Sequence, residues 1–422
     1  MPALPGPVSE SERVTSLDVL RGCAVLGILL VNITSFAMPG AAFVNPTALG
    51  TMSRADWATW LACHVLAEGK FITLFSMLFG AGILLFVART EARGERVARL
   101  HYRRMFWLLL FGIAHAYLLW SGDILFTYAI CGMLVYPLRR LPPRKLFVTG
   151  FLVFGVSTAI NLFLNWSLPH WPSQTLAEVN GEYWRPARDQ IAAELRTYRS
   201  GWLTQMPDRV AEAWFLQGPY LLMNVLWYVA GLMLIGMAMF RWGVITGERS
   251  RRFYQRMILF GALAGLPLIV FGVYRNFQAG WSIRYSLFAG TEFNSWGSLG
   301  LAAAYMGGAV LMSRTRRPGW LVDRLAAVGR MAFTNYILQS LLCTTLFYGH
   351  GLGLFGRLSR VGQLAVVGGV WMLQLAWSPA WLRRFSYGPL EWLWRSLTYG
   401  VRQPFRRVRL SPAGRPVPVA EC

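Results

Sequence analysis

The feature that most constrains this chain is a series of apolar blocks separated by short arginine-rich runs. Each block is roughly 18 to 25 residues long, enough to cross about 30 Å of hydrocarbon as an α-helix. Only 14% of the 422 residues are charged, whereas soluble proteins carry about a quarter. The pattern predicts an all-α polytopic membrane protein embedded in a lipid bilayer.

We expect ten membrane-spanning helices in this chain. They cover about 17–38, 70–88, 104–121, 123–138, 145–166, 214–240, 257–274, 294–313, 331–348 and 361–379. Residues 55–67, ADWATWLACHVLA, are too short and too polar to span, and predict an external interfacial helix. The Trp and Tyr content of SYGPLEWLWRSLTYG predicts a helix at the cytoplasmic interface.

The net charge of +22 comes mainly from arginines placed between alternate apolar blocks. Loops retained in the cytoplasm carry such an excess, so we expect both termini in the cytoplasm and an external insert at 167–213. The predicted parts are a cytoplasmic tail over 1–16, one transmembrane domain over 17–400 and a basic tail over 401–422. Because membrane topology accounts for the positive charge, we expect no nucleic-acid partner. The five cysteines have no metal-ligand spacing, so we expect neither a metal site nor a disulfide framework.

The first apolar block, TSLDVLRGCAVLGILLVN, carries three polar side chains that are costly to bury in lipid. At about 100° per residue, Asp18, Arg21 and Asn32 fall within one sector about 60° wide. Such a stripe usually faces the bundle interior or a wet cavity. Asp18 and Arg21 would lie at the cytoplasmic end and Asn32 roughly 16 Å further along. The structural alternative is a neutralised helix start and an interhelical hydrogen bond from Asn32.

A histidine and an acid lie close together in FGIAHAYLLWSGDIL. His115 falls near the middle of the third predicted span, where it is the only side chain able to exchange a proton near neutral pH. Asp123 begins the fourth span, where capping the helix is the structural alternative. A structural histidine is likewise the alternative for His115.

Two further sets of polar residues accompany the spans. Glu68 and Lys70 lie at the outer entrance of the second span, where they could pair or line a mouth for a polar substrate. In GRMAFTNYILQSLL, Arg330 lies at the cytoplasmic end of the ninth span. Asn335 and Gln339 follow at i and i+4 on one face, suited to substrate binding or to interhelical hydrogen bonds.

Sorting these residues by depth gives two groups. The middle and outer half holds Asn32, Glu68, Lys70, His115 and Asp123. The cytoplasmic mouth holds Asp18, Arg21, Arg103, Arg104 and Arg330. This layout suits a site where a phosphorylated donor docks on the inner cations and an acceptor approaches from outside.

These stretches resemble the successive signatures of the YeiB-like family of bacterial inner-membrane proteins, whose function is largely unknown. They are SLDVLRGCAVLGILLVN, EGKFITLFSMLFGAG, GIAHAYLLWSGDIL, GLMLIGMAMFRWG, GRMAFTNYILQS and YGPLEWLWRSLTYG, within a match from about Arg13 to Gly400. The opening LDxxRG with its later Asn also resembles the wider transmembrane acyltransferase superfamily. That superfamily includes heparan-α-glucosaminide N-acetyltransferase.

The resemblance implies transfer of an acyl group from coenzyme A at the cytoplasmic face to a hydroxyl or amine beyond the membrane. The acceptor would be a small molecule or a glycan, and acyl-CoA would be a co-substrate with no bound cofactor. Asp18, Arg21 and Asn32 match the superfamily's first-span motif, and His115 and Asp123 match only the YeiB-like pattern.

The first span departs from the pattern of the acyltransferases that act on surface glycans. Those enzymes generally place a histidine in or near this span, and here it has none. His64 lies between the first two spans, roughly where the glucosaminide acetyltransferases keep their histidine, but its spacing to the following span differs.

Three functions follow from these residues. An acyltransferase would use His115 as base, with His64 in reserve, and Asn32 as oxyanion donor. In it, Asp18 and Arg21 would order the donor's phosphates. A carrier would move a small polar or anionic solute past the same stripes. An envelope scaffold would use the polar residues for structure alone. The acceptor, the acyl chain and the oligomeric state stay open, and a homo-oligomer is compatible with the sequence.

Overall fold

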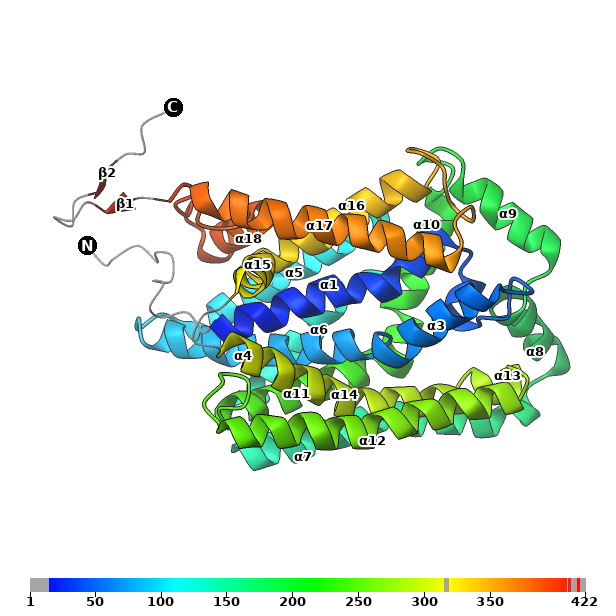
Figure 1. Ribbon diagram of the computed structural model, residues 1–422, viewed down its shortest axis with the longest axis horizontal. Coiled ribbons are helices and arrows are strands. Elements are labelled where there is room, and N and C mark those ends of the chain that lie inside the picture. The colour runs from blue at the N-terminus through cyan, green and yellow to red at the C-terminus, as the bar shows by residue number, and fades with distance from the viewer. Residues whose placement is uncertain (1–14, 315–318, 408, 411–415, 418–422) are drawn as a thin grey trace.

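The computed structural model describes residues 15–314, 319–407, 409–410 and 416–417. Most of the predicted 1–16 tail and much of the 401–422 tail therefore lie outside the described residues. The described chain is a helical bundle with one two-stranded β ladder, β1 (Arg409–Leu410) with β2 (Pro416–Val417). Most of the long helices run along the long axis of the molecule, with α1 (Thr15–Ala37) in the middle of the view (Figure 1).

The remaining helices follow in chain order. The first half has α2 (Ala41–Val44), α3 (Arg54–Leu66), α4 (Lys70–Glu91), α5 (Val97–Leu118), α6 (Leu125–Val135), η2 (Tyr136–Arg140), α7 (Pro143–Ser167), η3 (Leu168–His170), α8 (Ser173–Val179), η4 (Asn180–Trp184) and α9 (Arg188–Tyr198). The second half has α10 (Met206–Gln217), η5 (Leu221–Val225), α11 (Leu226–Arg241), α12 (Arg251–Gln278), α13 (Ile283–Ser286), α14 (Ala289–Ser313), α15 (Trp320–Arg330), α16 (Ala332–Phe347), α17 (Arg360–Arg384) and α18 (Pro389–Tyr399).

Six helical segments of the described residues are long and apolar enough to cross a membrane. They are Thr15–Ala37, Arg54–Glu91, Pro143–His170, Met206–Arg241, Arg251–Gln278 and Arg360–Arg384. The other four predicted spans fall on α5, α6, α14 and α16. Of these, α6 has 11 residues and α16 has 16, fewer than the about 20 that a crossing helix needs. The structure confirms the helical membrane architecture with six such segments.

Large apolar side chains cover the outer faces of the peripheral helices. Leu152 on α7, Phe260 on α12 and Met372 on α17 are 68%, 62% and 70% exposed. A monomeric soluble protein rarely leaves contiguous apolar surface in water. These faces therefore indicate contact with the acyl chains of a bilayer.

The central helix α1 crosses α15 so closely that the two backbones touch. A Cβ built on Gly22 would overlap the carbonyl oxygen of Leu325, and one on Gly329 would overlap that of Asp18. Small residues permit this kind of approach between membrane helices. The crossing places Asp18 beside Arg330, the last residue of α15.

The bundle has two distinct ends (Figure 1). The helices α15 and α18 and the first residues of α1 lie at one end, which we call the arginine end. The helices α8 and α9 of the 167–213 segment lie at the other, the insert end. The structure confirms the predicted helices in 55–67, as α3, and in SYGPLEWLWRSLTYG, as α18, and the partly helical 167–213 segment.

Candidate functional site

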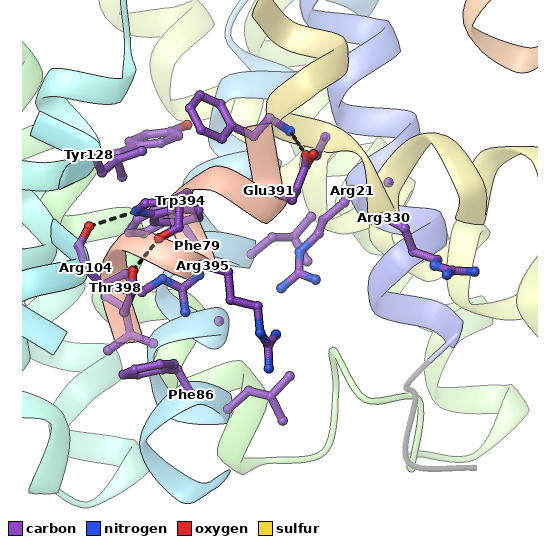
Figure 2. A pocket seen from close by; sticks show the side chains of 18 of the residues that line it. Arg21, Phe79, Phe86, Arg104, Tyr128, Arg330, Glu391, Trp394, Arg395 and Thr398 are labelled. Atoms are coloured by element: carbon purple, nitrogen blue, oxygen red, sulfur yellow. Dashed lines mark hydrogen bonds between the residues drawn. The ribbon is translucent and has the colours of Figure 1, made fainter. Parts of the chain in front are cut away.

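A cavity of about 370 Å³ lies at the arginine end of the bundle. Among the described residues, six arginines and two carboxylates line it: Arg21, Arg89, Arg93, Arg104, Arg330, Arg395, Asp18 and Glu391. Figure 2 shows Arg21, Arg104 and Arg395 reaching it from three different helices. The side chain of Arg330 extends away from these three in the same view.

Both carboxylates of the cavity are engaged by neighbouring groups. Asp18 Oδ1 lies 3.5 Å from Arg21 Nη1. Glu391 accepts hydrogen bonds from the backbone N–H groups of Phe333 at 2.7 Å and Thr334 at 3.0 Å, and from the Thr334 hydroxyl at 2.5 Å. It thus caps the first turn of α16, where a helix leaves its amides unsatisfied. Burial raises the pKa of Glu391 above its usual value, against these hydrogen bonds. The excess of guanidinium groups suits a polyanionic ligand.

Arg104 is held in place by aromatic rings. Its guanidinium carbon lies 4.9 Å from the centroid of the Phe86 ring and 4.3 Å from that of Trp394. The indole N–H of Trp394 donates to the Arg104 carbonyl at 2.9 Å (Figure 2). Because cation–π contacts fix the side chain without neutralising it, the charge stays available to the cavity.

The cavity wall turns apolar away from the arginine end. Along α1 it runs from Asp18 through Val25 to Ile28, a distance of about 15 Å at the helical rise. Phe79 of α4 and Tyr128 of α6 line the same inner part. The cavity therefore joins a cationic mouth to an apolar interior.

A buried histidine stands beyond this interior. His115 Nδ1 lies 2.8 Å from Asp123 Oδ1, and its Nε2 lies 2.9 Å from Ser340 Oγ. The side chains of His115 and Asp123 are 1% and 0% exposed, and Ser340 is also buried. An ionised carboxylate can only accept, so Nδ1 carries the proton and Nε2 of a neutral ring accepts from the Ser340 hydroxyl. The three side chains form a serine–histidine–aspartate relay.

The turn between α5 and α6 positions the acid of this relay. Asp123 Oδ2 accepts the backbone N–H of Phe126 at 2.7 Å, so one oxygen caps α6 while the other holds His115. A Cβ on Gly112 of α5 would overlap the Phe126 amide nitrogen. The glycine therefore lets α5 approach α6 closely enough for His115 to meet Asp123.

Tyr336 stands between the relay and the cavity. It lines the cavity, and its ring centroid lies 5.2 Å from that of His115. The Tyr336 hydroxyl is buried beside the Ile124 backbone N–H, and no acceptor for its own proton is found among the described residues. Tyr336 also lies one helical turn before Ser340, on the same face of α16.

A second histidine pair lies near the insert end. His64 Nδ1 lies 2.8 Å from Glu68 Oε2, and the His64 ring stacks on Trp60 with 5.0 Å between centroids. Lys70 is fully buried and donates to the carbonyl oxygens of His64 and Glu68 and to Asn294 Oδ1. Lys70 therefore bonds the backbone carbonyl of Glu68, while the Glu68 carboxylate contacts His64. A pocket of about 30 Å³ borders His64 and Glu68, room for about one water.

The polar stripe of α16 ties helices together. Gln339 Nε2 donates to the Val25 carbonyl at 3.1 Å and to Gln374 Oε1 at 2.9 Å. Asn335 Nδ2 donates to Ser378 Oγ at 3.0 Å. Both side chains are buried and neither lines the cavity. Their contacts are those of interhelical hydrogen bonds to α1 and α17.

The predicted site residues therefore separate into groups. Asp18, Arg21, Arg104 and Arg330 line the cavity, and His115 pairs with Asp123. His64, Glu68 and Lys70 gather near the insert end. Asn32 is half-buried and borders neither pocket.

Ser340 and Tyr336 were not predicted as site residues. A serine or a tyrosine in an apolar helix is common, and the only available signal was their i, i+4 spacing beside the stripe of Asn335 and Gln339.

Comparisons with known proteins cover both the cavity and the relay. Residues 239–401 match the family described as "Protein of unknown function (DUF418)". The chain is 35% identical to the uncharacterized protein YeiB of Escherichia coli, over 93% of this chain and 98% of that protein. It is 32% identical to the uncharacterized protein YxaH of Bacillus subtilis, over 95% and 98%. An uncharacterized 39.9 kDa protein from the amylase 3' region of Bacillus acidopullulyticus is 30% identical, over 94% and 97%.

Proposed function

The chain belongs to the YeiB-like family of bacterial proteins, and from this premise we propose that it is a membrane-embedded acyltransferase. It moves an acyl group from acyl-CoA at the cytoplasmic face of the bacterial cytoplasmic membrane to a hydroxyl or amine on the other side. The observation that carries the proposal is an arginine-lined cavity whose apolar inner wall meets a buried histidine relay.

The arginine end faces the cytoplasm in this proposal. Arginine runs are retained on that side, and the start of α1 and α18 lie at the same end of the bundle. In this proposal α5, α14, α16 and α6 continued by η2 complete ten crossings together with the six apolar segments. Both termini are then cytoplasmic, and the 167–213 segment is external.

The spacing along α5 fits a coenzyme A thioester. Arg104 and His115 are 11 positions apart on this helix, about 16 Å at the helical rise. An extended pantetheine arm spans a distance of this order. Phosphates held by the arginines would therefore place the thioester near His115, with the acyl chain against the apolar wall.

His115 supplies the base of the reaction. Its Nε2 is the atom able to take a proton, because Nδ1 is held by Asp123. The carboxylate stabilises the imidazolium that forms, as in other relays of this kind. General-base catalysis of this type contributes about 10²–10⁴-fold in rate.

The test is acyl transfer by the purified protein in nanodiscs. Acetyl-CoA is supplied with a panel of amino-sugar and hydroxyl acceptors, and the free thiol of coenzyme A is measured. The wild type should release thiol in an acceptor-dependent way, and His115→Gln should lose about 10²-fold or more. The matched control is His170→Gln, because His170 is an exposed histidine on η3.

Two results would contradict the proposal. Uptake of a polar solute into proteoliposomes without thiol release would indicate a carrier. A His115→Gln variant that differs from the wild type only in thermal stability would indicate a scaffold.

A further inference from the structure

We propose that Ser340 is the nucleophile of this protein and carries the acyl group as an ester between donor and acceptor. The inference rests on the proposed acyl transfer and goes beyond it, since His115 could also activate the acceptor directly. It makes the reaction a two-step transfer through a covalent intermediate.

The hydrogen bonds of Ser340 are those of an activated hydroxyl. Its Oγ lies 2.9 Å from His115 Nε2, and His115 Nδ1 lies 2.8 Å from Asp123 Oδ1. A serine is a weak nucleophile until an adjacent base takes its proton, and the base needs a third group to fix its tautomer. Here α16, α5 and the turn before α6 supply the three groups.

Two threonines of α16 make a different kind of contact from Ser340. Thr344 Oγ1, one turn further along, donates to the Leu341 carbonyl at 3.3 Å. Thr334 Oγ1, near the start of the helix, donates to Glu391. Both contacts serve the local backbone or a helix cap. Ser340 instead reaches across to an imidazole on another helix.

A donor for the oxyanion is also available. The buried hydroxyl of Tyr336 lies beside the Ile124 backbone N–H but has no acceptor for its own proton among the described residues, and its ring packs beside His115 on the wall of the cavity. Leaving a buried polar group unpaired is costly, so an unpaired O–H at this place is suited to a ligand atom. We assign to it the stabilisation of the negative oxygen that forms when Ser340 attacks.

The first half of the reaction acylates the protein. Ser340 Oγ attacks the thioester carbonyl carbon while His115 Nε2 takes the hydroxyl proton. The new C–O bond forms, the C–S bond breaks, and the coenzyme A thiolate leaves with the proton from His115. Coenzyme A then departs toward the arginine end.

The second half returns Ser340 to its starting state. The acceptor hydroxyl or amine attacks the ester carbon while His115 takes its proton. The bond from carbon to Ser340 Oγ breaks, and that oxygen recovers the proton from His115. No oxidant or reductant is needed, because both halves are acyl exchanges.

In this proposal the acceptor approaches the relay from the insert end of the bundle. The Trp202 indole N–H donates to the Leu118 carbonyl at 2.9 Å, and Ser121 Oγ donates to Glu212 Oε2 at 2.7 Å. These contacts join the 167–213 segment and α10 to the turn that carries Asp123. The relay therefore has the cavity on one side and the insert on the other.

The experiment is intact-protein mass spectrometry of the full chain in nanodiscs after incubation with acetyl-CoA and no acceptor. We expect a mass increase of one acetyl group, located on Ser340 by peptide mapping, and a burst of thiol equal to the protein concentration. Ser340→Ala should lose both the label and the transfer to acceptor. Ser340→Cys should trap a thioester that neutral hydroxylamine removes.

The matched control is Thr344→Val, which removes a buried hydroxyl one turn along the same helix and should keep both label and transfer. Melting temperatures show whether each variant is folded. If Ser340→Ala transfers acetyl at the wild-type rate, or if the label maps elsewhere, Ser340 is not the nucleophile and the proposed function stands. If the folded wild type releases no thiol and takes no label with any acceptor, both proposals are wrong.

Discussion

Replacing one cavity arginine should weaken the binding of coenzyme A by a predictable amount. In Arg104→Met the guanidinium is lost, while an unbranched apolar side chain still packs between Phe86 and Trp394. A hydrogen bond to a charged group contributes about 1.5–3 kcal/mol. Since 1.4 kcal/mol is a factor of ten in affinity, the dissociation constant should rise about 10- to 100-fold.

The assay is isothermal titration of coenzyme A into protein in nanodiscs at low and moderate salt. Arg99→Met is the matched control, because Arg99 is exposed on the same helix and does not line the cavity. That variant should change the affinity by about twofold at most, the usual range for surface substitutions. If both variants lose the same affinity for coenzyme A, the net positive charge of this end attracts the ligand and Arg104 has no specific role. If Arg104→Met binds coenzyme A as tightly as the wild type, the phosphates bind elsewhere.

Three further predictions concern stability and are read from melting curves in nanodiscs. Glu391→Ala leaves the first amides of α16 without their acceptor, and should lower the free energy of unfolding by about 2 kcal/mol; an unchanged melting curve would disprove the cap. Gly80→Val forces a Cβ into the Met233 carbonyl and should cost about 1–3 kcal/mol, whereas Gly155→Val meets nothing and should be tolerated. Burial raises the pKa of Glu194 from 4.5 to about 6. Its contribution to the free energy of unfolding is therefore fully present below pH 4.5 and is lost as the pH rises through 6. That loss should be about 1 kcal/mol for this half-buried group and absent in Glu194→Gln.

The helical architecture and the charge asymmetry could be predicted because they are local properties of the chain. Twenty apolar residues predict a span wherever they occur, and an arginine run predicts a retained loop without knowledge of any neighbour. The cap at Asp123 was predictable for the same reason, since its partner is three residues away.

The number of spans and the relay depend on packing between distant segments. The predicted spans 123–138 and 331–348 fall on α6 with η2 and on α16, and α6 and α16 are shorter than the about 20 residues of a crossing helix, so the sequence alone does not fix the number of crossings. Ser340 and His115 are 225 positions apart in the chain. Their contact depends on how α16 is rotated against α5, which no periodicity within either helix specifies.

The rotation of each helix also decides which of the predicted site residues meet. Asn32 and His115 fall at similar predicted depth, but depth does not fix the direction in which a side chain points. In the structure His115 is held by Asp123 and Ser340, and Gln339 is used to join α16 to α1.

If the protein transfers acyl groups across the membrane, donor and acceptor must react from opposite sides. Proteoliposomes with the arginine end outward receive acetyl-CoA labelled in the acetyl group outside, and hold an amine acceptor inside. We expect label on the enclosed acceptor while coenzyme A stays outside, and no label with His115→Gln. Transfer that occurs only when the acceptor is supplied outside instead, or intact acetyl-CoA found inside, would contradict transfer across the membrane.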